Sequence, residues 1–375
     1  PPLRVKSRAC SRPPRPRAAA PQGNPVTQTP IQAERQVRLE PSGRTFTVIP
    51  GETVLEAAIR QGVGLPYGCR NGACGACKGA LKSGSLAYGD HQERAITEAE
   101  KAAGKALTCC TKPLTDIVLE IRELAGLKDL AIRTLPARVE KIEKPAEDVA
   151  ILYLKLPASE RLQFLAGQYI DILMKGGVRR SYSMANPPHD DTHLQLHVRR
   201  TPGGAFSRYV FEEMKERAII RFEGPLGGFY LREDSDKPMI LVAGGTGFAP
   251  IKAVIEHAFH KGVDRQMVLY WGARSLADLY LPELPVKWQQ EHDNFTFIPV
   301  LSDPLPADDW TGRTGFVHQA VLDDFPSLAG YQVYACGAPA MTDIARKTFV
   351  EERGLPDDEF YCDAFTSAPP APPPA

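Results

Sequence analysis

Three cysteines lie close together in the stretch Cys69-Arg-Asn-Gly-Ala-Cys74-Gly-Ala-Cys77, at C-x4-C-x2-C spacing. Clusters of the [2Fe-2S] type use this spacing together with a distant fourth cysteine, for which we select Cys109. The glycines between the thiols allow the backbone to approach the inorganic core and to direct N–H groups at the sulfurs. The alternative is a structural zinc site, but such sites usually pair two C-x2-C hooks and this chain has one. We therefore predict a [2Fe-2S] cluster held by these four cysteines.

A second candidate site begins at Arg180-Ser181-Tyr182-Ser183. On a strand, Arg180 and Tyr182 would share one side and Ser183 would face the other. An arginine offers a planar fork to phosphate, and a serine hydroxyl can donate a hydrogen bond to a ring. Farther on, Gly203-Gly204-Ala205-Phe206-Ser207 leads into a predicted helix over 207–214, whose N-terminus suits a phosphate. The alternative for the tetrapeptide is a strand that simply ends in a polar turn.

A third candidate site is the turn Gly244-Gly245-Thr246-Gly247-Phe248-Ala249-Pro250, which lies between an apolar strand and a predicted helix. A glycine turn in this context can hold a pyrophosphate. It is not the G-x-G-x-x-G fingerprint, which argues against a simple dehydrogenase. Cys336-Gly337-Ala338-Pro339-Ala340-Met341 follows another apolar strand; a small buried thiol at a strand end is the alternative interpretation of Cys336.

Length and composition limit the class of protein. The chain has 375 residues, enough for two or three domains, and its 43% hydrophobic and 24% charged content is typical of globular proteins. A formal net charge of zero argues against nucleic acid or an anionic membrane as the main partner. No apolar run has the length of a membrane span, and no leader with a cleavage site is evident. The scattered remaining cysteines (Cys10, Cys110, Cys336 and Cys362) argue against a disulfide framework, so we expect a reducing cytoplasm.

The order of the elements divides the chain into modules. A hairpin, a short helix over 53–61, the cysteine loop and a returning strand resemble the plant-type ferredoxin fold, an α+β β-grasp domain, over 34–124. After a linker over 125–133, short strands separated by turns predict an antiparallel β-barrel over 134–233. Alternating strands and helices then predict an α/β domain with a parallel sheet over 234–366. The proline-rich ends, 1–33 and 367–375, are predicted to be disordered tails.

The motifs of the second and third sites occur in an order that resembles the ferredoxin-NADP reductase superfamily. The resemblance implies that Arg180 pairs with the pyrophosphate of FAD, that Tyr182 packs on the isoalloxazine, and that Ser183 lies near its N5. It also implies that Gly204 and Ser207 cradle the diphosphate.

For the nicotinamide cofactor, the resemblance implies a turn that binds NAD(P)H and a cysteine beside the nicotinamide. At the end of the fold it implies a carboxylate that relays a proton, Asp363, and an aromatic ring that shields the flavin, Phe365; a plain terminal strand is the alternative there. The residues of the turn and the cysteine motif are Gly244, Gly245, Thr246, Gly247, Pro250, Cys336 and Gly337.

The choice between NADH and NADPH depends on the residues after the second strand of the parallel sheet. Asp278 could bind a ribose 2′-OH, which favours NADH, whereas Arg274 and Ser275 could bind a 2′-phosphate. We expect NADH because of the similarity to NADH-using relatives, and NADPH stays open.

Taken together, residues 34–366 resemble the iron–sulfur flavoprotein reductases, and within them most closely the CDP-6-deoxy-delta-3,4-glucoseen reductases. The resemblance implies an oxidoreductase that passes electrons from NADH through FAD and a [2Fe-2S] cluster to a partner protein, either an oxygenase component or a deoxysugar dehydratase. Ser183, Cys336 and Asp363 are the expected catalytic residues. A flavin is needed because a hydride carries two electrons and the cluster accepts one. The alternatives are a diaphorase or flavin reductase that acts on small acceptors, and a non-catalytic redox sensor or carrier.

Overall fold

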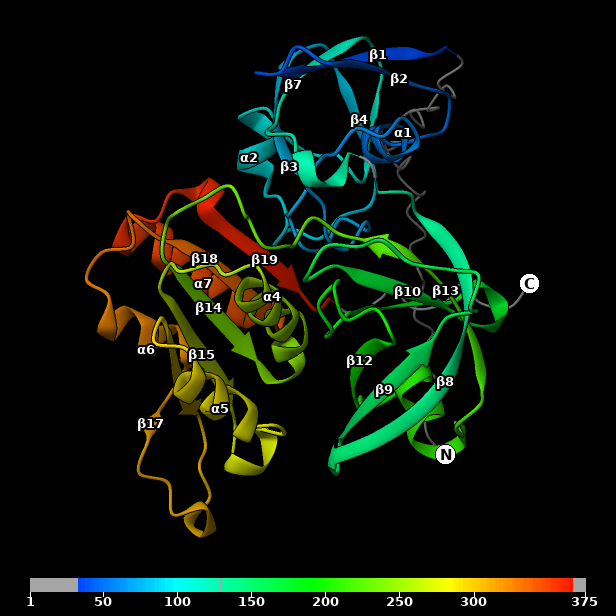
Figure 1. Cartoon of the computed structure of the whole chain (residues 1–375). Coiled ribbons are helices and arrows are strands. Elements are labelled where there is room, and N and C mark those ends of the chain that lie inside the picture. The colour runs from blue at the N-terminus through cyan, green and yellow to red at the C-terminus, as the bar shows by residue number, and fades with distance from the viewer. Residues whose placement is uncertain (1–32, 129, 367–375) are drawn as a thin grey trace, which may run out of the picture.

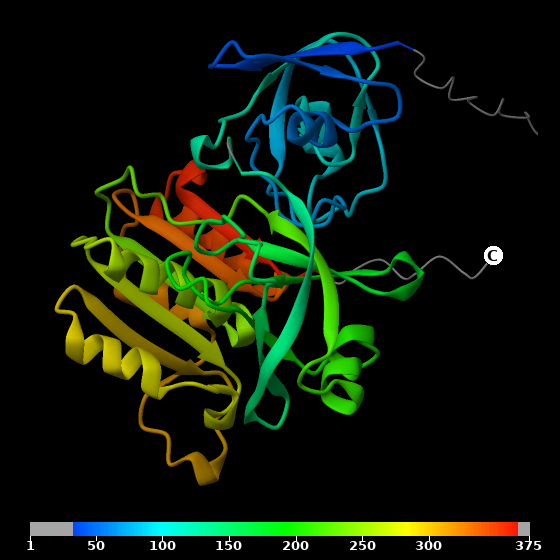
Figure 2. The ribbon, with the colours of Figure 1, turned by 45° about the vertical axis from the view of Figure 1, so that its right-hand side comes forward.

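The computed structural model describes residues 33–128 and 130–366, which form three modules built on sheets (Figure 1). The predicted tails, 1–33 and 367–375, lie outside the described residues except for Ala33. In both ribbon views the N-terminal module sits above the other two, which lie side by side (Figures 1 and 2).

The N-terminal module is a five-stranded mixed sheet packed on a short helix, α1 (Val54–Arg60). A capping box starts this helix: the Thr53 hydroxyl accepts from the Glu56 N–H, and the Glu56 carboxylate accepts from the Thr53 N–H. The strands, in order across the sheet, are β2 (Thr45–Val48), β1 (Arg35–Glu40), β7 (Ile117–Glu120), β3 (Lys78–Ser83) and β5 (Lys105–Leu107). A small ribbon of β4 (Leu86–Tyr88) and β6 (Thr111–Pro113), and the helix α2 (Glu98–Ala102), complete the ferredoxin-like fold that the sequence predicts.

The middle module is a six-stranded antiparallel sheet. A bridge between Met184 and Leu196 brings its two outer strands together, which curls the sheet into the predicted barrel. The strands, in order, are β11 (Arg179–Ser183), β10 (Tyr169–Leu173), β13 (Ile219–Leu226), β8 (Arg133–Ala146), β9 (Val149–Lys155) and β12 (Leu194–Arg199).

The helix predicted over 207–214 differs in the structure. It begins earlier, as α3 (Ala205–Arg208), and continues as a π-helical turn, η3 (Tyr209–Glu213). The wider turn brings Met214 to the same buried face as Phe206 and Val210, so that all three pack on the barrel core.

The C-terminal module is a six-stranded parallel sheet covered on both faces by helices. Leu241 and Val242 are neighbours on one strand but belong to two different cores, which explains the uninterrupted apolar sequence of that strand. Helices α4 (Phe248–His260) and α5 (Glu283–Glu291) cover one face, and α6 (Val317–Asp324) and α7 (Pro339–Arg353) the other. The strands, in order, are β17 (Arg313–Thr314), β16 (Phe295–Leu301), β15 (Met267–Ala273), β14 (Met239–Gly244), β18 (Gln332–Gly337) and β19 (Phe360–Ala364).

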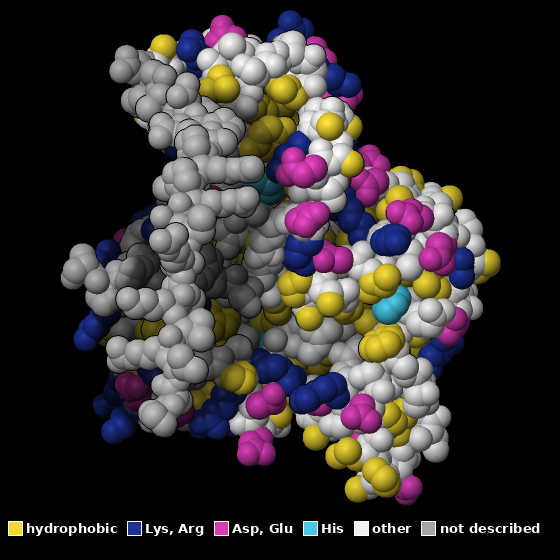
Figure 3. All heavy atoms as spheres, turned by 180° about the vertical axis from the view of Figure 1, so that it is seen from behind, with side chains coloured by type: hydrophobic (Ala, Val, Ile, Leu, Met, Phe, Trp, Pro, Cys, Tyr) yellow, Lys and Arg dark blue, Asp and Glu magenta, His cyan; other side chains and the backbone are white. Residues whose placement is uncertain are grey.

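Where Figure 3 shows the described residues, basic and acidic side chains are interspersed on the surface. This distribution agrees with the formal net charge of zero. Among the described residues, none of the helices has both the length and the apolar character needed to cross a membrane.

Candidate active site and cofactor sites

The four predicted cluster ligands come together in the structure. The Cys69 and Cys74 thiols lie close enough to shift each other's pKa, and Cys109 stands in the same relation to both Cys77 and Cys110. Four thiols suit a [2Fe-2S] cluster, which proteins hold with four cysteines. The residues present therefore fit a [2Fe-2S] cluster.

Backbone N–H groups of the cysteine loop point at the cysteine sulfurs. The Cys69 N–H points at Cys74 Sγ at 3.4 Å, and the Ala73 N–H points at Cys69 Sγ at 3.3 Å. Hydrogen bonds from Cys110 and Cys77 lower the pKa of Cys109, and one from Cys74 lowers the pKa of Cys69; the same contacts raise the pKa of Cys77 and of Cys74. Gly72 has a φ of +71°, and a Cβ there would lie 2.7 Å from the Asp90 carbonyl oxygen, so only glycine fits.

The three predicted catalytic residues meet where the barrel touches the parallel sheet. Ser183, buried at the end of β11, donates from its hydroxyl to Asp363 Oδ2 at 2.8 Å. Cys336 Sγ, at the end of β18, lies 3.9 Å from the same oxygen. The structure thus brings together side chains from two modules that are separated by up to 180 positions in the chain.

Proton affinity in this group is set by burial. Burial raises the pKa of Asp363 to about 6, against the hydrogen bonds from Ser183 and Cys336, which lower it. Burial also raises the pKa of the Cys336 thiol. Asp363 can therefore gain and lose a proton near neutral pH, whereas Cys336 stays a neutral thiol.

Arg180 and Tyr182 occupy the same strand as Ser183. The Arg180 guanidinium donates to the carbonyl oxygen of Arg179 at 2.8 Å and has no acidic partner among the described residues, so its remaining donors are free for an anion. The Tyr182 ring packs on Phe206, with ring centroids 5.1 Å apart.

The glycine turn before α3 is closed by Ser207. Its buried hydroxyl lies 3.2 Å from the Thr201 nitrogen, from which it accepts, and 3.2 Å from the Gly204 carbonyl oxygen. A Cβ at Gly204 would lie only 2.5 Å from the Ser207 Oγ. Ser207 thus holds the turn together, and residues 201–203 of the turn are exposed.

The two glycine motifs of the parallel sheet cross each other, backbone against backbone, at Gly247 and Gly337. A Cβ at Gly247 would lie 2.1 Å from the Cys336 carbonyl oxygen, and one at Gly337 would lie 3.0 Å from the Gly244 carbonyl oxygen. Both turns lie at the carboxyl ends of parallel strands, where ligands of such sheets bind. The residues present therefore fit a dinucleotide, because backbone that carries no side chains can approach a pyrophosphate closely.

A tryptophan side chain of the neighbouring strand β15 fixes the first glycine turn. Gly245 has a φ of +53°, and its carbonyl oxygen accepts from Trp271 Nε1 at 3.0 Å. Pro250 is buried, and Thr246 is half-buried. The Phe365 side chain is 38% exposed, and its backbone N–H donates to the Gly337 carbonyl oxygen at 2.8 Å.

The residues considered for cofactor choice bind one another. Asp278 Oδ2 accepts from the Ser275 N–H at 3.1 Å and from its hydroxyl at 3.2 Å. Asp278 Oδ1 accepts from Arg199 at 3.2 Å and lies 3.5 Å from Arg274, whose side chain is 77% exposed. Ser275 and Asp278 thus engage each other, so this pair by itself does not favour a 2′-OH over a 2′-phosphate.

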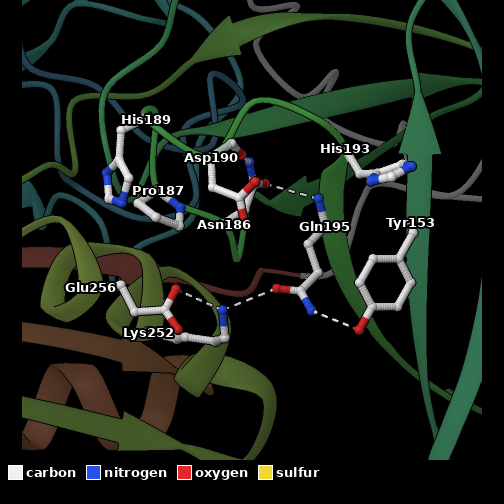
Figure 4. Close-up of a pocket in the computed structure, with 9 residues that line it drawn as sticks. All are labelled: Tyr153, Asn186, Pro187, His189, Asp190, His193, Gln195, Lys252 and Glu256. Carbon is white, nitrogen blue, oxygen red and sulfur yellow. Dashed lines mark hydrogen bonds and ion pairs between the residues drawn. The ribbon is translucent and has the colours of Figure 1, made fainter. Parts of the chain in front are cut away.

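The sequence did not predict a role for Lys252, which connects the parallel-sheet module to the barrel. This buried lysine on α4 donates to Gln195 at 3.1 Å and to Glu256 at 2.8 Å (Figure 4). It also donates to the Ala185 carbonyl oxygen at 3.1 Å. It borders a cavity of about 380 Å³ and joins the nucleotide-binding turn to the end of the flavin strand. A lone lysine shortly after the glycine turn, in an otherwise apolar helix segment, was the only signal in the sequence.

Three family models match the chain, in the order in which the modules occur. They are described as 2Fe-2S iron-sulfur cluster binding domain, over 37–114, Oxidoreductase FAD-binding domain, over 136–230, and Oxidoreductase NAD-binding domain, over 241–347. These matches confirm the predicted cofactors: a [2Fe-2S] cluster, FAD and NAD.

Individual proteins are similar over nearly their whole length. The CDP-6-deoxy-L-threo-D-glycero-4-hexulose-3-dehydrase reductase of Yersinia pseudotuberculosis is 42% identical over 88% of this chain and 98% of its own. Reductase component 2 of the terephthalate 1,2-dioxygenase of Comamonas sp. is 37% identical over 89% and 98%. The crystal structure of the Amycolatopsis cytochrome P450 reductase GcoB superposes with a TM-score of 0.73 at 37% identity, over 89% of this chain and 99% of that one. The chain therefore belongs to the family of NAD-dependent iron–sulfur flavoprotein reductases, oxidoreductases that join a ferredoxin-like, an FAD-binding and an NAD-binding domain in one polypeptide.

Proposed function

We propose that this chain oxidises NADH and delivers the two electrons singly to a partner protein. The balance is one NADH and two oxidised one-electron acceptors in, and one NAD⁺, one proton and two reduced acceptors out. The observation that carries the proposal is the convergence of Ser183, Asp363 and Cys336 at the junction of two modules, beside a turn of bare backbone.

When bound, FAD and the cluster supply the conversion of a hydride into single electrons. The chain's own residues position these cofactors and adjust their electronic properties. We assign Arg180 to the flavin pyrophosphate, Tyr182 and Phe365 to the two sides of the ring, and the Gly204 turn, closed by Ser207, to the diphosphate. Ser183 is proposed to donate to the ring nitrogen, and Asp363 to hold the proton that this hydroxyl exchanges.

The nicotinamide cofactor is proposed to lie along Gly244, Gly245, Thr246 and Gly247, ahead of Pro250, with its reactive ring at Cys336 and Gly337. The Asp278 carboxylate lies at the end of the neighbouring strand and suits a ribose 2′-OH. We therefore propose NADH as the substrate, and the match to the NAD-binding family model over 241–347 supports this choice. We propose that the ferredoxin-like module covers 34–124, the FAD-binding barrel 134–233 and the NAD-binding module 234–366.

The proposed acceptor is an oxygenase component or a deoxysugar dehydratase in the cytoplasm. Support comes from the names of the relatives, a dehydrase reductase at 42% identity and a dioxygenase reductase component at 37%. Assays with each class of purified acceptor, in turn, decide between them.

The substitution Cys74→Ser tests the route. It removes one cluster ligand, and we expect NADH-dependent reduction of cytochrome c to fall to background while reduction of ferricyanide, which small flavoenzymes support directly, continues. If cytochrome c reduction continued unchanged, the chain would instead be a diaphorase that acts on small acceptors.

A further inference from the structure

The loop that carries the first cluster ligand is attached to the barrel by its backbone. Tyr169, a buried residue at the start of β10, donates from its hydroxyl to the Gly68 carbonyl oxygen at 2.6 Å. Gly68 directly precedes Cys69. In the sheet, Tyr169 is paired with Ser183 of the flavin strand. One residue therefore spans the space between the flavin strand and the cluster loop.

A second attachment comes from Arg70, which directly follows Cys69 and has a φ of +59°. Its guanidinium forms an ion pair with Asp171 of β10 and lies 3.5 Å from the Glu223 carboxylate of β13. The Asp171 side chain is only 5% exposed, and its other oxygen accepts from the Ser181 hydroxyl at 2.6 Å. The charge of Arg70 is thus linked to the middle of the R-x-Y-S strand.

Two more contacts fix the loop on either side. The Gly228 N–H donates to the Tyr67 carbonyl oxygen at 2.7 Å. Arg94 donates to the Ala73 carbonyl oxygen, inside the cysteine loop, and pairs with Asp343 of α7 at 2.6 Å. The cluster loop is therefore held by both other modules at once.

Such contacts matter because modules of one chain move relative to each other unless their interface is specifically stabilised. Electron tunnelling slows steeply with distance, so an interface that opens part of the time transfers electrons more slowly on average. An ion pair with one partner nearly buried resists both water and salt better than an exposed one.

We propose that Arg70 and Tyr169 are positioning residues for electron transfer. They hold the cluster loop against the flavin strand, so that a flavin bound at β11 and a cluster bound at Cys69 would lie at a short and fixed separation. The inference rests on the proposed function, and it adds two residues that act through the cluster loop without touching the reacting atoms.

The test uses the holoenzyme carrying Arg70→Gln or Tyr169→Phe. For Arg70→Gln, loss of a charge-assisted bond shifts the equilibrium between closed and open interfaces by about tenfold. We expect amide hydrogen exchange in peptides over 64–74 and around Gly228 to accelerate by about this factor. Transfer from flavin to cluster, followed by rapid mixing, slows in the same variants, whereas reduction of the flavin by NADH keeps its rate.

Each variant has a matched control. Arg179 contacts the same two acids, Asp171 at 3.7 Å and Glu223 at 2.8 Å, but stays within the barrel, so Arg179→Gln is expected to leave exchange over 64–74 as in the parent protein. For Tyr169, the control is Tyr153→Phe, which removes a tyrosine hydroxyl that donates to Glu143 and accepts from Gln195, both of them in the barrel and away from the cluster loop.

The inference is overturned if both variants exchange as slowly as their controls, or if exchange accelerates while flavin-to-cluster transfer keeps its rate. Failure of the proposed function looks different: the parent protein itself would not reduce cytochrome c with NADH, or would do so equally well as Cys74→Ser.

Discussion

At the scale of single residues, Asp363 combines an unusual proton affinity with a specific partner. Its carboxylate accepts from Ser183 across the junction of two modules, and its pKa stands at about 6 although the group ordinarily titrates at 3.8. A carboxylic acid that titrates near neutrality is the kind of group that exchanges protons in an active site. Two predictions belong to this scale.

The first prediction concerns stability against pH. Below pH 4, Asp363 is protonated in both the folded and the unfolded chain; between pH 4 and 6 the unfolded chain ionises while burial resists ionisation in the folded one. The free energy of unfolding should therefore fall as pH rises through this window, by up to about 3 kcal/mol, because each pKa unit corresponds to about 1.4 kcal/mol. In Asp363→Asn, which cannot ionise, this decrease in the free energy of unfolding should be absent.

The measurement is urea unfolding of the protein freed of FAD and cluster, followed by tryptophan fluorescence. All three tryptophans, Trp271, Trp288 and Trp310, lie in the module that contains Asp363, so the signal reports on that module alone. Parallel pH curves for the parent protein and Asp363→Asn would contradict the prediction.

The second prediction concerns Ser183. Its hydrogen bond lowers the pKa of Asp363, so Ser183→Ala should move the titration of Asp363 to a higher pH. Loss of one hydrogen bond to a charged group corresponds to about one pKa unit. Infrared difference spectroscopy of the carboxyl band gives the midpoint, and an unshifted midpoint would show that the bond is absent in solution.

At the scale of elements, the nucleotide site depends on two turns that cross as bare backbone. Gly247 packs against the Cys336 carbonyl oxygen, and Gly337 against the Gly244 backbone. The helices that follow these turns, α4 and α7, lie on opposite faces of the sheet, so the crossing fixes both faces relative to each other.

The third prediction follows from this crossing. Gly247→Ala would place a Cβ 2.1 Å from the Cys336 carbonyl oxygen, and overpacking of a core typically costs about 1–3 kcal/mol or more. We expect a lower urea midpoint by tryptophan fluorescence and weaker NADH binding. Gly330→Ala is the control, because a Cβ there meets nothing within 4 Å and its φ is not in the left-handed region.

At the scale of the whole molecule, the three cofactor sites lie along one line of contacts. Cys336 and Asp363 of the parallel sheet meet Ser183 of the barrel, and Tyr169, beside Ser183, meets the loop of Cys69. Covalent joining keeps the modules at high effective concentration, and the contacts then hold a single arrangement.

The fourth prediction is a weak dependence of internal electron transfer on salt. The Arg70–Asp171 pair is partly or wholly shielded from solvent, whereas screening acts mainly on exposed charges. Between ionic strengths of about 0.01 M and about 1 M, the rate of flavin-to-cluster transfer should change less than about twofold. A steep decline, measured by rapid mixing, would indicate that the modules find each other by long-range attraction.

Much of this protein could be predicted from local sequence. The spacing of Cys69, Cys74 and Cys77 and the two glycine turns are determined by a few consecutive residues, because each must present backbone or sulfur at a fixed separation along the chain. Alternating and continuous apolar runs likewise indicate the antiparallel barrel and the parallel sheet, because burial on one face or on two leaves different patterns.

Only the tertiary structure decided how these pieces meet. The convergence of the four cysteines, the bond from Ser183 to Asp363, and the contacts of Tyr169, Arg70 and Lys252 all join residues that are brought together by packing. No periodicity along the chain specifies which surface of one module will cover another, because such contacts depend on shape and charge in three dimensions. The sequence by itself determined which cofactors this chain can hold; the packing of its modules determined the path between them.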